Sequence, residues 1–186
     1  MIGKKFLPFR RKRLRKTNYK RRLELLKSEL PRLVVRTTIN NVIVQVVDYS
    51  PDGDKIVAAF NSVDLKKFGW KMNTANLPAA YLSGIRCAIL AKNKKVAKCV
   101  LDTGIFTPVK GSVTYAVVKG FIDAGVEVPC SEEALPSGER VSGKHIEEYT
   151  KTLNNYGERF SRYEKAGIKP ANIVKHFEEV KKKVMS

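Results

Sequence analysis

The chain has 186 residues, of which 36 are Lys or Arg and 18 are Asp or Glu, so its formal net charge is +18. A hydrophobic fraction of 43% excludes a fully disordered chain, and the length fits one domain with extensions rather than two large domains. Such a charge excess destabilises a compact state by self-repulsion, so it argues against an ordinary soluble enzyme and predicts a polyanionic partner such as nucleic acid.

The positive charge is concentrated at the N-terminus. Residues 1–22 hold eleven Lys or Arg and no acidic residue, with Phe6, Phe9 and Tyr19 between them. No apolar period of a core-forming element is present, so we expect an arm that is mobile alone and is ordered by RNA. Arg suits bidentate phosphate contacts, and the aromatic rings can stack on unpaired bases. The alternatives are a solvated tail or a membrane-surface patch, although a patch usually needs a second signal such as lipidation.

A short helix and three strands are predicted next. The helix covers 20–30, where leucines recur at helical spacing, and Pro31 ends it. Apolar and β-branched runs predict strands at 33–37, 42–47 and 55–60, joined by an Asn-Asn turn and a Ser-Pro-Asp-Gly-Asp turn. Three strands with such short connections predict an antiparallel meander.

Helices and strands alternate after the meander. A helix is expected to open at 76–78 (Asn-Leu-Pro), followed by a strand at 98–102 and a second helix between Ser112 and Gly125. A last short strand is possible at 126–128. The predicted fold class is therefore mixed α/β, in which the meander continues through βα units into a mixed sheet with helices packed on it.

Pro129 is the predicted boundary of the core. Residues 130–145 are polar and rich in turn formers, and helices are predicted over about 144–156 and 171–184. These divisions give three parts: a basic arm with its short helix (1–30), a mixed α/β core (31–129) and a helical C-terminal extension (130–186).

Few residues suit a metal site, a cofactor or a disulfide framework. The three cysteines are far apart in sequence and the chain has only two histidines, so we expect no metal, no cofactor and a reduced, cytoplasmic protein. No apolar run approaches the roughly 18 residues of a membrane span, and the basic N-terminus lacks the apolar region of a signal peptide.

Three carboxylates keep an enzymatic alternative open. Asp48, Asp64 and Asp102 lie at or near predicted strand ends, where metal-dependent nucleases place their acids. Aspartate beside a turn is nevertheless routine, and no nucleophile elbow or Walker-type phosphate loop accompanies them. We therefore expect no catalytic residues. A basic DNA-binding protein is the other alternative.

Two further segments could contact phosphates. Arg32 and Arg36 are expected to share one sheet face with Val34, where they could continue the track of the arm or be ordinary exposed strand residues. Residues 101–112 form a Gly-bracketed loop that enters a helix, where backbone N–H groups and Lys110 could meet a phosphate. The same loop could be only a tight connection.

Five long stretches, in this order, resemble one known family: PFRRKRLRKTNYKRRLELLKS (8–28), PRLVVRTT (31–38), FGWKMNTANLPAAYLSG (68–84), LDTGIFTPVKGSVTYAVVKGFIDAGVEVP (101–129) and ERVSGKHIEEY (139–149). The chain resembles the archaeal form of the universal 5S-rRNA-binding protein of the large ribosomal subunit, number eighteen in the universal naming. The resemblance implies a ribonuclease-H-like topology without that enzyme's activity. It also implies binding of 5S rRNA, attachment of 5S to 23S rRNA in the central protuberance, and neighbouring ribosomal proteins as partners.

The resemblance also implies which residues contact RNA. They lie in the arm, the first hairpin and the loop before the second core helix, and they are Arg10, Arg11, Arg13, Arg15, Lys16, Tyr19, Arg21, Arg22, Arg32, Arg36, Lys110 and Gly111. The sequence departs from the family at two points. Asn40-Asn41 stands where the family often has a basic residue followed by His, and Ala75 stands where it often has Gly.

Overall fold

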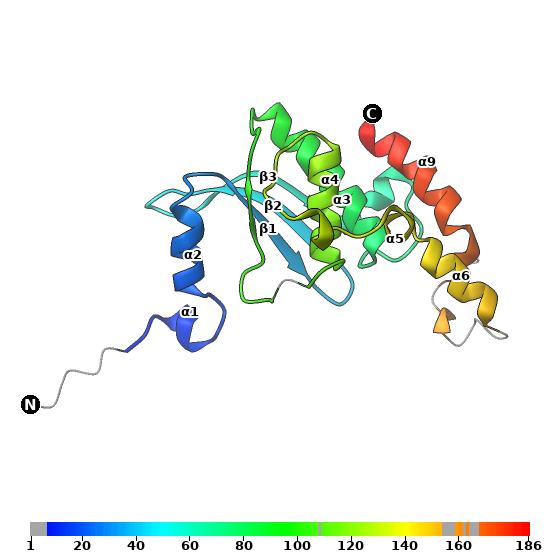
Figure 1. The fold of residues 1–186 in the computed structure, drawn as a ribbon, viewed down its shortest axis with the longest axis horizontal. Coiled ribbons are helices and arrows are strands. Elements are labelled where there is room, and N and C mark those ends of the chain that lie inside the picture. The colour runs from blue at the N-terminus through cyan, green and yellow to red at the C-terminus, as the bar shows by residue number, and fades with distance from the viewer. Residues whose placement is uncertain (1–6, 108, 154–158, 162, 164–167) are drawn as a thin grey trace, which may run out of the picture.

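The computed structural model describes residues 7–107, 109–153, 159–161, 163 and 168–186 (Figure 1). The elements of the arm and core are α1 (Arg10–Arg13), α2 (Tyr19–Leu26), β1 (Arg32–Thr37), β2 (Val42–Asp48), β3 (Lys55–Asn61), the 3-10 helix η1 (Ser62–Phe68), α3 (Leu77–Asn93), β4 (Val100–Asp102) and α4 (Val113–Asp123). The remaining elements are η2 (Glu132–Ala134), α5 (Gly138–Ser142), α6 (Lys144–Thr152), η3 (Pro170–Asn172) and α9 (Ile173–Met185). None of the described helices is both long enough and apolar enough to cross a membrane.

The four strands form one mixed sheet in the order β3-β2-β1-β4. The β1–β2 and β2–β3 pairs are antiparallel, and the β1–β4 pair is parallel. The sheet and its helices confirm the predicted mixed α/β class. Register brings distant residues together: Arg32 lies opposite Val47 near the end of β2, and Val34 lies opposite Asp102 on β4.

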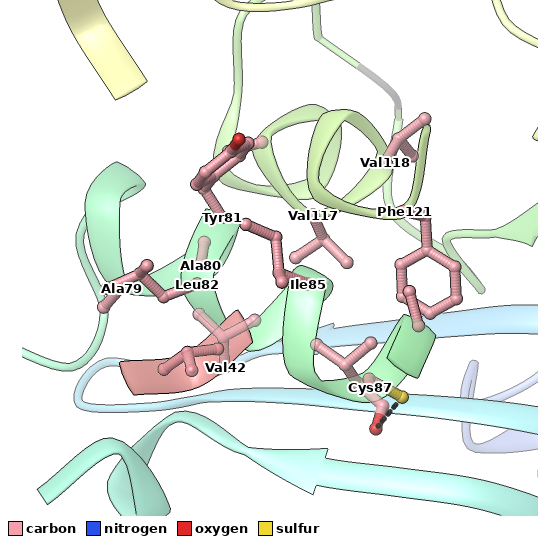
Figure 2. Close-up of a cluster of buried hydrophobic side chains, with 14 of the residues drawn as sticks. Val42, Ala79, Ala80, Tyr81, Leu82, Ile85, Cys87, Val117, Val118 and Phe121 are labelled. Atoms are coloured by element: carbon pink, nitrogen blue, oxygen red, sulfur yellow. Dashed lines mark hydrogen bonds between the residues drawn. The ribbon is translucent and has the colours of Figure 1, made fainter. Parts of the chain in front are cut away.

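Helices α3 and α4 cover one face of the sheet (Figures 1 and 2). Because side chains alternate along a strand, Leu33 and Val35 point into this helix-covered core, whereas Val34 belongs to the other face. Figure 2 shows Ile85 of α3 and Val117 and Phe121 of α4 gathered between the helices and the sheet. The sheet therefore has one face covered by helices and a second face that is available for other contacts.

Glycines let α3 and α4 approach closely. A Cβ on Gly84 of α3 would lie 2.5 Å from the carbonyl oxygen of Val117, and a Cβ on Gly120 of α4 would lie 2.5 Å from that of Tyr81. Both obstructing atoms belong to the backbone, so a substitution cannot be absorbed by a side-chain rotation.

Gly84→Ala is therefore expected to lower the free energy of unfolding by about 1–3 kcal/mol, because the added methyl group overpacks the helix crossing. Gly138→Ala is the matched control, since a Cβ at Gly138 meets nothing within 4 Å. Urea denaturation of both variants measures the difference. Equal midpoints for Gly84→Ala and Gly138→Ala would contradict this account of the crossing.

The C-terminal helices pack on the core at the end of the molecule opposite to the arm (Figure 1). Ile173, Phe177, Val180 and Val184 of α9 belong to the same buried cluster as the sheet and α3. His176 stacks on Trp70, with ring centroids 5.3 Å apart, and its Nε2 accepts the N–H of Lys71 at 3.1 Å. Burial lowers the pKa of His176, which favours the neutral ring that this contact requires.

Several elements differ from the sequence prediction. The strand predicted at 98–102 is shortened to β4, and the strand predicted at 126–128 is reduced to one bridge between Lys98 and Glu127. The helix predicted over 20–30 is α2 and ends earlier, at Leu26, and the short helix α1 in the arm was not predicted. The helices η1 and α5 were not predicted. The helix predicted over 144–156 ends at Thr152, and residues 154–156 lie outside the described part.

Candidate nucleic-acid interface

Two hydrogen bonds and one contact between aromatic rings give the arm a defined local conformation. Arg11 Nε donates to Thr17 Oγ1 at 2.8 Å, which closes the turn between α1 and α2. The Asn18 side chain accepts the N–H of Arg21 at 3.1 Å and so caps α2. The Phe9 and Tyr19 rings lie 5.4 Å apart, so the two ends of the arm loop also touch. That the arm is mobile without RNA stays a prediction.

A chain of ion pairs fastens the arm to the sheet. The guanidinium of Arg22 donates both its Nη groups to the carboxylate of Asp54, at 2.8 and 2.7 Å. Arg32 donates one Nη to Asp54 at 2.6 Å and the other to Asp102 at 2.7 Å. The ion pairs therefore run from Arg22 to Asp54, from Asp54 to Arg32 and from Arg32 to Asp102. They connect α2 with the β2–β3 turn, β1 and β4.

These contacts shift the protonation of their members. The hydrogen bond from Arg22, helped by a second one from Arg32 and opposed by burial, lowers the pKa of Asp54. The hydrogen bond to Asp54 in turn raises the pKa of Arg22. A carboxyl group with a lowered pKa stabilises the folded state above its unfolded pKa, and this stabilisation is lost as the pH falls through its folded pKa. The fastening is thus complete at neutral pH.

A groove separates the arm from the uncovered face of the sheet. It has a volume of about 660 Å³, and Val34, Gln45, Val47 and Ile56 are among the strand residues that line it. Six basic side chains also line it, against two carboxylates: Arg11, Lys16, Arg21, Arg22, Arg32 and Arg36, with Asp54 and Asp102. A groove walled mainly by one sign of charge concentrates its field, so this groove attracts a polyanion.

The structure brings most of the predicted RNA-contact residues to this groove. Tyr19 lines it together with those six basic residues. Arg10, Arg13 and Arg15 are exposed on α1 and on the turn after it, outside the groove lining. Arg32 and Arg36 share the Val34 face as predicted, but Arg32 is only 3% exposed and is committed to two carboxylates.

Lys110 and Gly111 lie elsewhere and already have contacts. Lys110 Nζ lies 2.8 Å from a carboxylate oxygen of Glu133, and both side chains are exposed. Gly111 has a φ of +67°, and its N–H donates to the carbonyl oxygen of Ala134 at 2.9 Å. Neither residue lines the groove. The N–H of Gly111 is therefore not free for a phosphate.

The carboxylates of the nuclease alternative have other roles. Asp102 accepts from Arg32 and from the N–H of Gly104 at 2.8 Å, and Asp64 pairs with Lys67 at 2.8 Å. Asp48 accepts the N–H of Tyr49 at 2.9 Å. In the part of the chain that the structure describes, no group of three or more His, Cys, Asp or Glu could hold a metal ion.

Comparisons with known proteins identify the family. The family described as "Ribosomal large subunit proteins 60S L5, and 50S L18" matches residues 4–96, which include the arm, β1 to β3 and α3. The large ribosomal subunit protein uL18 of Desulfurococcus amylolyticus is 45% identical over 183 residues, which are 96% of this chain and 93% of the relative. The chain belongs to the uL18 family. As a uL18 protein it is a structural constituent of the large subunit of the cytoplasmic ribosome and not an enzyme.

Membership confirms the resemblance seen in the sequence, and it removes the nuclease and DNA-binding alternatives as the main function. One feature of the interface was missed at the sequence level. Asp54 was read only as a turn residue, but it pairs with both Arg22 and Arg32. No local signal marks Asp54, because its position beside the arm arises from long-range packing.

Proposed function

We propose that the chain binds 5S rRNA and helps attach it to 23S rRNA in the central protuberance, beside neighbouring large-subunit proteins. The observation that carries this proposal is the groove between the arm and the sheet face that α3 and α4 do not cover. Six basic residues from the arm and β1 converge on it, as a phosphate backbone requires. Family membership supports an rRNA partner, and the binding of 5S rather than another RNA is the part that needs the test.

The proposed contact residues have different roles. Arg11, Lys16, Arg21 and Arg36 neutralise phosphates along the groove, while Arg10, Arg13 and Arg15 extend the track along the exposed arm. Arg22 and Arg32 hold the arm against the sheet through Asp54. Lys110 and Gly111 do not line the groove, so they are not among the proposed groove contacts, and their contact with RNA stays a prediction.

The three-part division of the chain is also a proposal. An arm at 1–30 and a core at 31–129 fit the groove between them, and an extension at 130–186 ends in helix α9, which packs on the core. The strand order β3-β2-β1-β4, with only β4 parallel to its neighbour, supports a ribonuclease-H-like sheet topology.

Binding to a 5S rRNA transcript should be strongly salt-dependent. Each neutralised phosphate contributes about −0.7 to −0.9 to the slope of log affinity against log salt, so roughly five contacts give a slope on the order of −4. Lys16→Ala is expected to flatten this slope by about one unit. Lys182→Ala is the matched control, because Lys182 is an exposed lysine on α9, the helix at the end of the molecule opposite to the arm. Filter binding at several salt concentrations measures both slopes.

Two outcomes would contradict the proposal at different levels. A slope near zero for the unaltered chain would remove its electrostatic basis. Equal slopes for Lys16→Ala and Lys182→Ala would show that the charge acts from the whole surface and that the groove is not the binding track.

A further inference from the structure

A second hollow lies on the other side of the arm. It has a volume of about 460 Å³ and is lined by Lys12, Arg15, Thr17, Asn18, Tyr19, Lys20 and Ile105. Thr17, Asn18 and Tyr19 also line the groove, so the two depressions share one wall. An RNA strand that follows the groove therefore passes within reach of this hollow.

The hollow combines an apolar surface with positive charge. Tyr19 is partly exposed and contacts Phe9, which is itself 72% exposed. Ile105 is 50% exposed and comes from the loop after β4, far from the arm in sequence. The three basic residues Lys12, Arg15 and Lys20 complete the lining, and no carboxylate is part of it.

The loop and the arm are held together by the protein itself. Arg21 Nη1 donates to the carbonyl oxygen of Phe106 at 3.3 Å, and Thr103 Oγ1 donates to the same oxygen at 2.9 Å. Gly104 has a φ of +66°, and its N–H donates to Asp102. Hydrogen bonds at the residues before and after Ile105 thus hold it next to Tyr19. An isoleucine that is held in place and yet exposed is suited to contact a ligand.

We propose that this hollow receives one unpaired nucleotide of the bound rRNA, with its base against Tyr19 and Ile105 and its phosphates beside Lys12, Arg15 and Lys20. This inference rests on the proposed function and deepens it, because it assigns a base-binding site beside a track for the backbone. An unstacked base offers an apolar face and a polyanionic backbone at once, and the lining matches both. A protein segment would have to be acidic as well as apolar to fit equally well.

A double-mutant cycle on the full-length chain with a 5S rRNA transcript tests the site. Tyr19→Ala is expected to weaken binding by about 10- to 100-fold, as loss of a stacking surface does. Ile105→Ala is expected to weaken it by roughly threefold or more through lost apolar contact. If both side chains touch one base, the double variant loses less than the product of the two single losses. The salt slope stays unchanged in all three, because no phosphate contact is removed.

Ile122→Ala is the matched control for Ile105→Ala, since Ile122 is 39% exposed on α4, which covers the sheet face opposite to the groove. Chemical probing of base edges should show one unpaired nucleotide that is protected by the unaltered chain and becomes reactive with Tyr19→Ala. Unchanged affinity in Ile105→Ala, or losses that multiply in the double variant, would overturn the shared-nucleotide site while leaving the 5S proposal intact. Failure of the unaltered chain to bind 5S rRNA would instead refute the proposed function.

Discussion

A chain that lacks residues 1–22 should remain folded and lose at least about 100-fold of its affinity for 5S rRNA at about 150 mM salt, because electrostatic contacts to phosphates dominate such binding. The segment carries eleven of the 36 basic residues. It contributes Arg11, Lys16, Arg21 and Arg22 to the groove but no residue to the buried core. Filter binding measures the affinity, and far-UV circular dichroism checks the fold.

A second variant removes positive charge from the arm but leaves the arm in place. Replacing Arg10, Arg13 and Lys16, which are exposed, by Gln keeps the contacts that shape the arm and the Arg22–Asp54 pair, and it should recover only part of the lost affinity. The idea fails if the truncated chain binds 5S rRNA with near-native affinity. It also fails if the Gln variant binds as well as the unaltered chain, because the arm would then act through its shape alone.

Arg32→Ala should give the largest loss of stability, about 3 kcal/mol. Removing one partner of a buried pair leaves an uncompensated charge and typically costs about 3–5 kcal/mol. The lower end is expected here, because the Asp54 carboxylate is 27% exposed and keeps Arg22, whereas the largely buried Asp102 side chain loses its only ion-pair partner among the described residues. Chemical denaturation of the isolated protein measures this effect.

Arg36→Ala is the matched control for Arg32→Ala. Arg36 lies on the same strand and the same sheet face and lines the same groove, but it has no ion-pair partner in the described part of the chain. Its loss should therefore leave stability nearly unchanged and weaken 5S binding. If the two variants lose stability equally, the ion-pair chain from Arg22 to Asp102 is not what holds this part of the fold together.

The sheet could be predicted because its signals are local. Alternating apolar residues and two short turns marked β1, β2 and β3 to within a residue or so of their observed bounds. The predicted range of β4 was too long. Residues 98–102 are apolar enough for a strand, but only Val100–Asp102 pair with β1. The helix η1 was missed because its start is capped by Asn61, a signal that also fits an ordinary turn.

The sequence indicated which segments are basic but not how they are arranged around the groove. Charge density alone pointed to the arm, and strand alternation correctly placed Arg32 and Arg36 on one face. The sequence could not show that Arg32 pairs with Asp102, because the two are 70 residues apart and meet only through the parallel pairing of β1 with β4. Lys110 was read as a residue that could assist a phosphate contact in the loop before a helix. In the fold it pairs with the exposed Glu133, and its contact with RNA stays a prediction.

Selective capture of 5S rRNA from total ribosomal RNA is the sharpest test of whether this chain recognises 5S rRNA. The full-length chain, immobilised and incubated with total ribosomal RNA at about 150 mM salt, is washed and the retained RNA is sequenced. We expect that 5S rRNA is enriched far above its share of the input, that excess duplex DNA does not displace it, and that the chain lacking residues 1–22 retains none. Retention of RNA in proportion to input abundance, or equal displacement by duplex DNA, would show a nonspecific polyanion binder and contradict the claim.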